Sequence, residues 1–130
     1  MPAYDDGRFD PPAPLARVSL RNPERGTTLP DVLMLIDSGA DVTLIPLASV
    51  NQLGVTVSSG EGYELMGFDG SRSVAQAVQL DLLFLRRAFK GRFLLIDQEW
   101  GILGRDILNH VAMLLDGPRM SWSEQSDTDE

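Results

Sequence analysis

The chain has 130 residues, which is enough for one domain with a hydrophobic core and too few for two domains of ordinary size. Its formal net charge of −8 argues against binding to the phosphate backbone of nucleic acids, because such binding needs a basic face. The sequence has no cysteine, which excludes disulfides, thiolate metal sites and a cysteine nucleophile.

The start of the sequence does not have the pattern of a targeting segment. No basic region followed by an apolar stretch opens the sequence, so a signal peptide is not expected. No apolar run approaches the length that is needed to cross a bilayer. We therefore expect a soluble, cytoplasmic protein that does not act on a membrane.

The N-terminal third predicts a flexible arm followed by a hairpin. Residues 1–14 mix four prolines with acids and have little to bury, which favours a flexible arm. Apolar residues alternate imperfectly over 15–20 and run together over 32–36, and the segment 21–26 between them is rich in turn formers. This pattern predicts two strands that deliver Asp37 to the turn after the second one.

The next segment predicts a strand, a helix and another strand. Residues 42–45 are β-branched and apolar, which favours a short strand. Apolar residues at three-residue spacing then predict a helix that begins near Pro46 and stops at Gly54. A strand over 55–57 follows.

The remainder of the chain consists of short apolar blocks between turn signals. Residues 63–66 and 73–80 predict a hairpin around the segment 67–70, whose Asp-Gly pair favours a tight turn. The segment 86–92 is interpreted as a connection between strands. The remaining predicted elements are strands over 82–85, 93–96, 111–115 and 119–122 and a short helix over 106–110.

Together these elements predict a mostly β fold. Many short strands with frequent turns and one or two short helices indicate a closed, barrel-like domain. We assign the domain to residues 15–122 and interpret residues 123–130 as an acidic, disordered tail.

Two motifs carry the polar chemistry of the sequence. An apolar run leads directly into Asp37, and a carboxylate at the end of a buried strand must be hydrogen-bonded, paired or protonated. Ser38 supplies a hydroxyl that can donate to such a group, and Gly39 allows close approach or a sharp turn. The segment 100–106 has a similar form, with a bulky apolar pair, a glycine and a polar residue.

These motifs resemble those of the retropepsin-like aspartic proteases, which include the retroviral proteases and cellular relatives with one catalytic motif per chain. The resemblance rests on Asp-Ser-Gly-Ala-Asp-x-Thr at 37–43 and on Ile-Leu-Gly-Arg-Asp-Ile-Leu at 102–108. It covers most of the chain, from Leu15 to Trp122. It implies an aspartic endopeptidase that cleaves extended or unfolded polypeptide and uses no metal and no cofactor.

The chemistry of such an enzyme requires two carboxylates. When two carboxylates share one proton, the ionised one accepts a proton from water and the protonated one polarises the scissile carbonyl. The Asp-Ser-Gly motif occurs once in this sequence. The second carboxylate must then come from a second copy of the chain, and the enzyme hypothesis predicts a homodimer with a twofold axis between two Asp37 side chains.

The resemblance also implies a role for individual residues. Asp37 is the catalytic acid, Ser38 hydrogen-bonds across the axis, and Gly39 offers its carbonyl to the substrate. Asp41 anchors the substrate main chain and forms an ion pair with Arg105. The residues that the resemblance places against the substrate are Ala40, Asp41, Val42, Leu44, Gly67, Phe68, Asp69, Trp100 and Ile102.

Two further implications concern the flap and the dimer. The segment 67–70 falls where the family has its flap, a hairpin that closes over a peptide bound as an added strand. This segment has fewer glycines than retroviral flaps and carries Asp69 near the expected tip. Residues 111–122 resemble the C-terminal hairpin of cellular relatives, where we expect the main dimer contact.

The same residues allow other interpretations. Asp37 can be a strand-end acid that caps a turn, and the chain can be a non-catalytic dimerisation or peptide-binding module with this fold. The intact Asp37, Ser38 and Gly39 favour the enzyme. Magnesium binding by Asp37 and Asp41 lacks a regular oxygen cage, and a serine triad would have to recruit the single histidine, His110, without supporting context.

Overall fold

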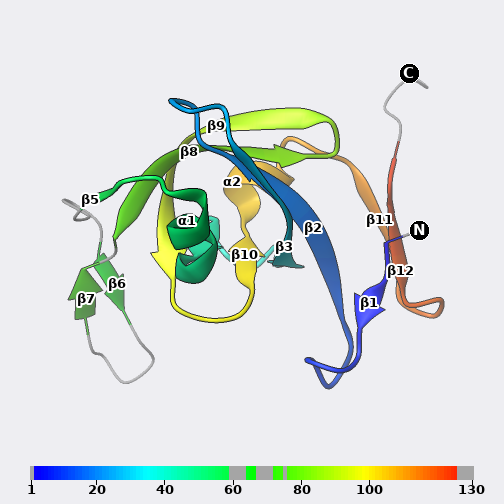
Figure 1. The fold of residues 1–130 in the computed structure, drawn as a ribbon. Helices are drawn as coiled ribbons and strands as arrows, with labels where there is room; N and C mark the ends of the chain where they lie inside the picture. Colours follow the sequence, from blue (N-terminus) through cyan, green and yellow to red (C-terminus); the bar gives the residue numbers. More distant parts are fainter. Residues whose placement is uncertain (1, 59–63, 67–71, 75, 126–130) are drawn as a thin grey trace.

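The computed structural model describes residues 2–58, 64–66, 72–74 and 76–125 (Figure 1). The strands are β1 (Tyr4–Asp5), β2 (Ala13–Arg21), β3 (Thr28–Ile36), β4 (Leu44–Pro46), β5 (Val57–Ser58), β6 (Glu64–Met66), β7 (Arg72–Val74), β8 (Ala77–Phe84), β9 (Arg87–Ile96), β10 (Gly101–Leu103), β11 (Met113–Asp116) and β12 (Ser121–Glu124). The helices are α1 (Leu47–Leu53) and α2 (Arg105–Leu108).

Six of these strands form a closed β-barrel (Figure 1). Their order is β2-β3-β10-β4-β9-β8, and the ring closes because β8 pairs with β2 as well as with β9. The pairs β3–β10 and β4–β9 are parallel, and the other four pairs are antiparallel. The predicted fold class, a mostly β closed barrel with one or two short helices, is confirmed.

The barrel encloses an aliphatic core. Leu20, Met34, Leu80, Leu82 and Leu103 have no exposed surface and come from β2, β3, β8 and β10. Burying one such side chain stabilises a fold by about 1.5–3 kcal/mol. Strands from both halves of the sequence contribute to this core. Among them, β3 and β10 are paired side by side; the first motif follows β3, and the second begins in β10.

The β2–β3 hairpin is set by a buried polar residue at its turn. Asn22 is almost completely buried, and its Oδ1 accepts hydrogen bonds from the backbone N–H groups of Glu24 (3.0 Å) and Arg25 (3.3 Å). Gly26 adopts a positive φ of 75°, which glycine does without steric cost. The turn therefore fixes the register that places Asp37 directly after β3.

One predicted connection is wrong. The segment 86–92 was expected to link two strands, but nearly all of it belongs to β9, and the turn consists of Leu85 and Arg86. Both turn residues have positive φ, 53° and 63°, as in the tight turns that match strand twist. Three charged residues, Arg87, Lys90 and Arg92, make this part of β9 look like a loop in sequence.

Both helices lie near their predicted positions. Helix α1 ends at Gly54, which has a φ of 79° and donates its N–H to the carbonyl of Val50 at 3.0 Å. Helix α2 begins at Arg105, one residue before the predicted start, and ends at Leu108, two residues before the predicted end. No helix in the described part of the chain is long and apolar enough to cross a bilayer.

The N-terminal segment differs from the predicted flexible arm. β1 pairs with the first residues of β2, so the barrel strand starts at Ala13, two residues before the predicted domain boundary. Ala3 forms a bridge with Ser121, and the N terminus lies beside β12 (Figure 1). Backbone hydrogen bonds to the C-terminal hairpin thus order a segment that has few apolar side chains of its own.

The C-terminal hairpin, β11–β12, lies where the sequence predicts one, but its second strand runs further along the chain. Ser123 and Glu124, assigned to the acidic tail, are paired in β12 with Leu114 and Met113. The side chain of Trp122 is only 3% exposed, and its indole N–H donates to the carbonyl of Leu15 at 2.9 Å. This hydrogen bond and the contact of the indole with the ring of Phe84 tie the hairpin to the barrel.

Candidate active site

Asp37 stands at the end of β3, in a turn that orients its carboxylate. Its backbone N–H donates to the carbonyl of Leu103 (3.1 Å), and its carbonyl accepts from the N–H of Ala40 (3.1 Å). The Oδ1 atom accepts a hydrogen bond from the N–H of Gly39 at 2.9 Å. The side chain is half-buried, and its second oxygen has no partner among the described residues.

Two glycines allow β10 to pass close to this turn. A Cβ at Gly104 would lie 2.5 Å from the carbonyl carbon and oxygen of Val42, and one at Gly101 would overlap the carbonyl oxygen of Leu44. Both obstacles are backbone atoms, which cannot rotate away. The glycines of the second motif are therefore required for close approach of the two motif segments.

Arg105 connects the second motif to the first. Its Nη1 donates to the carbonyl of Ser38 at 2.7 Å, its Nη2 forms an ion pair with Asp41, and its backbone N–H donates to the carbonyl of Ala40 at 2.9 Å. The structure thus places Arg105 against Asp41. Because their side chains are 43% and 83% exposed, the ion pair itself adds little stability. Together with the bonds of Arg105 to the carbonyls of Ser38 and Ala40, it instead fixes the conformation of the loop that follows Asp37.

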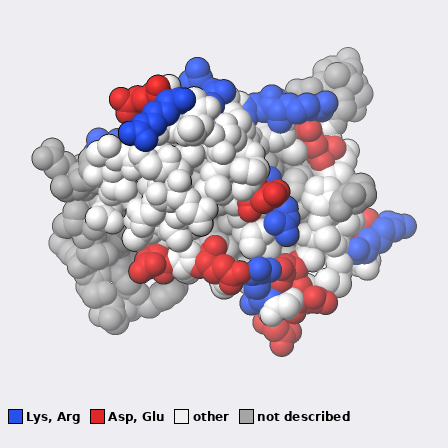
Figure 2. All heavy atoms as spheres, in the orientation of Figure 1, with Lys and Arg blue, Asp and Glu red and all other residues white. Residues whose placement is uncertain are grey.

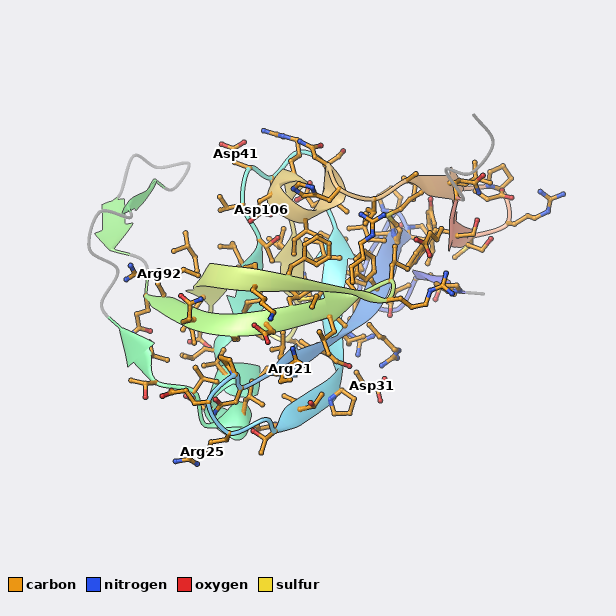
Figure 3. All side chains as sticks on the ribbon, turned by 90° about the horizontal axis from the view of Figure 1, so that it is seen from above. Arg21, Arg25, Asp31, Asp41, Arg92 and Asp106 are labelled. Atoms are coloured by element: carbon orange, nitrogen blue, oxygen red, sulfur yellow. The ribbon has the colours of Figure 1, made fainter. Side chains whose placement is uncertain are left out.

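A second link between the motifs was missed at the sequence level. The hydroxyl of Thr43 donates to Oδ1 of Asp106 (2.6 Å), and its backbone N–H donates to Oδ2 (3.1 Å). The same hydroxyl accepts from the N–H of Gly104 at 3.0 Å. In Figure 3, Asp106 and Asp41 lie at the same end of the molecule, beside α2. The sequence contains one indication of this link, because Thr43 and Asp106 are polar residues inside the two motifs, although no role was predicted for either of them.

The predicted pocket residues divide into two groups. Ile102 is the direct cross-strand partner of Leu44, both are half-buried, and Val42 is 41% exposed next to them. Trp100 lies apart, before the start of β10, where its ring meets that of Phe9. The Phe9 contact was not predicted, because the N-terminal segment had been interpreted as a free arm.

The predicted flap falls partly outside the described residues. β6 and β7 form the antiparallel hairpin expected on either side of the turn, with Met66 opposite Arg72. This hairpin stands away from the barrel in Figure 1. Gly67, Phe68 and Asp69 lie outside the described residues.

The alternative sites gain no support from the described residues. His110 lies beside Phe89, with ring centroids 6.2 Å apart, and its carbonyl accepts a hydrogen bond from Arg87. Among the described residues, His110 forms no hydrogen bond or ion pair with Ser38 or with an aspartate. Within the described ranges, no group of three or more histidine, aspartate or glutamate side chains is arranged to hold a metal ion.

Comparison with known proteins gives the fold. No protein-family model and no curated protein matches the sequence. Among solved structures, the chain is similar to the EIAV protease in complex with the inhibitor HBY-793, with a TM-score of 0.58, 26% identity, and coverage of 75% of this chain and 86% of that chain. It is also similar to the retroviral protease-like domain of Ddi1 from Leishmania major, with a TM-score of 0.50, 17% identity, and coverage of 89% and 98%.

Proposed function

Because the chain has the retropepsin-like fold, we propose that it is an aspartic endopeptidase that works as a homodimer and hydrolyses peptide bonds in extended or unfolded polypeptide. The observation that carries the proposal is the setting of Asp37. Its carboxylate is held by the N–H of Gly39 in a loop that Arg105 fixes through the Ser38 carbonyl. One oxygen of the carboxylate is thereby oriented, and the other has no partner among the described residues, which leaves it available to a water molecule.

The reaction needs the Asp37 side chains of two chains. The ionised carboxylate accepts a proton from a water molecule, whose oxygen attacks the scissile carbonyl carbon, while the protonated carboxyl donates to the carbonyl oxygen. Proton transfer to the nitrogen then lets the C–N bond break and leaves one proton on the pair. Two carboxylates that share one proton titrate as a unit, so the two are not both ionised at the same time.

The flanking residues are assigned to binding. Ser38 hydrogen-bonds across the axis, and its hydroxyl has no recorded partner within the described part of one chain, which leaves it available. Gly39 and Asp41 contact the substrate main chain. The residues assigned to the substrate side chains and to the flap are Ala40, Val42, Leu44, Trp100, Ile102, Gly67, Phe68 and Asp69.

The β11–β12 hairpin supplies the surface for the dimer. Leu114 and Leu115 are 51% and 52% exposed, and they neighbour each other in β11. Since successive strand residues point to opposite faces, both faces of the hairpin carry an exposed leucine. A hairpin packed only on its own barrel would bury one face. Apolar surface on both faces favours insertion between elements of a second copy.

The proposal is tested by a matched pair of isosteric substitutions in β3 and the turn that follows it. Asp37→Asn removes the catalytic acid, whereas Asp31→Asn makes the same change at an exposed position with a φ of 60°, which asparagine tolerates. Each protein is incubated with a diverse peptide mixture from about pH 4 to about pH 7, and the products are read by mass spectrometry. We expect cleavage by the wild type and by Asp31→Asn, and a loss of about 10²- to 10⁴-fold or more in Asp37→Asn.

The alternative function for this fold is that of a non-catalytic dimerisation or peptide-binding module. If a dimeric wild-type protein cleaves nothing, the chain is instead a dimerisation or peptide-binding module. Cleavage that survives in Asp37→Asn contradicts the aspartic mechanism directly.

A further inference from the structure

The N-terminal segment from Asp5 to Phe9 is attached to the loop that precedes β10. The guanidinium of Arg8 contacts Oε2 of Glu99 through Nε (2.8 Å) and Nη2 (2.7 Å), and its Nη1 contacts Oδ2 of Asp5 at 2.7 Å. The Oδ1 atom of Asp5 accepts from the N–H groups of Gly7 (3.0 Å) and Arg8 (2.7 Å). Arg8 therefore binds both Asp5, within its own segment, and Glu99, which is 91 residues away in sequence.

Each partner of this ion pair is followed in sequence by an aromatic residue, Phe9 after Arg8 and Trp100 after Glu99, and the two rings are in contact. The centroids of Phe9 and Trp100 are 4.8 Å apart with an interplanar angle of 61°, an edge-to-face arrangement. Both side chains are half-buried. Gln98 adds a hydrogen bond to the carbonyl of Trp100 at 3.0 Å. The ion pair and the ring contact together fix the position of the indole.

This contact lies within reach of the proposed active site. Gly101 pairs with Met34 and Leu103 with Ile36, so Trp100 falls opposite the part of β3 that lies four residues before Asp37. At about 3.3 Å per strand residue, this corresponds to about 13 Å. A peptide bound as an extended strand covers that distance within a few residues on either side of the bond that is cut. The lower edge of the molecule, near the loop after β1, shows acidic and basic atoms side by side (Figure 2).

We propose that residues 5–9 form a strap that positions Trp100 as one wall of a pocket for a large apolar substrate side chain. In this role Arg8 and Phe9 are positioning residues that determine specificity and take no part in the chemistry. The proposal rests on the proposed endopeptidase function for its substrate, whereas the strap itself is a property of one chain. A fixed aromatic wall offers a large apolar surface without the loss of side-chain freedom that a mobile tryptophan would suffer on binding.

The strap is first tested without turnover. The chain has two tryptophans, and Trp122 is only 3% exposed, so collisional quenching of fluorescence by acrylamide reports chiefly on Trp100. We expect stronger quenching in Phe9→Ala and Arg8→Gln than in the wild type, and wild-type quenching in Phe9→Leu, which keeps an apolar contact. The matched control is Arg25→Gln, because Arg25 is exposed and its side chain has no recorded partner among the described residues. Unchanged quenching in Phe9→Ala overturns the strap.

Specificity is then measured with pairs of peptides that differ at one position, with leucine or phenylalanine in one and alanine in the other. The wild type is expected to prefer the large side chain at one position, and Phe9→Ala to lower that ratio of kcat/KM by roughly two- to tenfold through KM. The kcat for the alanine peptide is expected to stay near that of the wild type. A ratio that is unchanged in Phe9→Ala, in a protein whose quenching has increased, overturns the role in specificity. Absence of cleavage by the wild type itself is a failure of the proposed function, and it is distinguished from the other outcomes by the wild-type control.

Discussion

Asp106 accepts hydrogen bonds from both the hydroxyl and the backbone N–H of Thr43, at 2.6 and 3.1 Å, across 63 residues of sequence. Thr43 is only 1% exposed and also accepts from Gly104, so the three residues form a partly buried connection between the two motif loops. The loop that carries Asp37 is therefore held from both ends, by Arg105 at Ser38 and by Asp106 at Thr43.

Removal of the Thr43 hydroxyl removes two of these three hydrogen bonds and leaves only the bond from the Thr43 backbone N–H to Asp106. Thr43→Val keeps the shape of the side chain but leaves the buried N–H of Gly104 without its acceptor, which costs about 1–3 kcal/mol. We expect Thr43→Val to lower the free energy of unfolding in urea by that amount and Thr43→Ser to lower it by much less. Equal losses in the two variants would show that the hydroxyl is not responsible.

Because β10 passes close to the Val42 backbone at Gly104, the addition of a methyl group there is expected to destabilise the fold. Gly104→Ala places a Cβ 2.5 Å from the Val42 backbone, whereas the corresponding Cβ at Gly91 in β9 meets nothing within 4 Å. Overpacking of this kind costs about 1–3 kcal/mol, and more where only backbone can yield. We expect thermal unfolding to show a large loss for Gly104→Ala and little change for Gly91→Ala. Similar melting temperatures for the two variants would contradict the geometry.

The exposed leucines of β11 predict how the dimer can be disrupted. Leu114→Lys adds a charge to an apolar face of the hairpin, and Ala88→Lys adds the same charge at an exposed position of β9. Sedimentation at several concentrations is expected to show weaker dimerisation for Leu114→Lys only, with activity lost in proportion to the dimer. Unaltered association of Leu114→Lys would place the dimer contact elsewhere.

The strap depends on pH through Asp5. The backbone N–H of Arg8, and then its guanidinium, hold the pKa of the Asp5 carboxyl below its ordinary value of 3.8. The hydrogen bond with Glu99 in turn raises the pKa of Arg8, which stays charged. The contribution of Asp5 is thus fully present above its ordinary pKa and is lost as the pH falls through the lowered, folded-state value.

We therefore expect constant acrylamide quenching of Trp100 from about pH 7 to about pH 4 and stronger quenching only below that range. The control is Asp5→Asn, which keeps an acceptor oxygen for the turn but cannot titrate. If the rise at low pH persists in Asp5→Asn, the titration of Asp5 is not responsible for it.

The elements that the sequence predicts well are those with local signals. Helix α1 follows from apolar spacing and from Gly54, and the strand before Asp37 follows from its uninterrupted apolar run. Residues 86–92 were misinterpreted because strand residues on an outer face can be charged, and composition alone does not separate such a strand from a loop.

The long-range features of the site had weaker signals or none. The ion pair between Arg105 and Asp41 was expected only through family resemblance, and the Thr43–Asp106 bonds join polar residues with no periodic pattern. The order of the N-terminal segment comes from backbone pairing with the C-terminal hairpin and from contacts of Arg8 and Phe9 with a distant loop. A proline-rich, acidic sequence gives no local indication of such partners.

Mixing of subunits tests most directly whether one active site contains two Asp37 side chains. Half of the wild-type chains are replaced by Asp37→Asn at constant total concentration, and the subunits are allowed to exchange before cleavage is measured. If both aspartates are needed, only about a quarter of the dimers are active, and the activity falls to about a quarter of its starting value. A fall to only about a half would mean that each chain works alone, which contradicts the shared site.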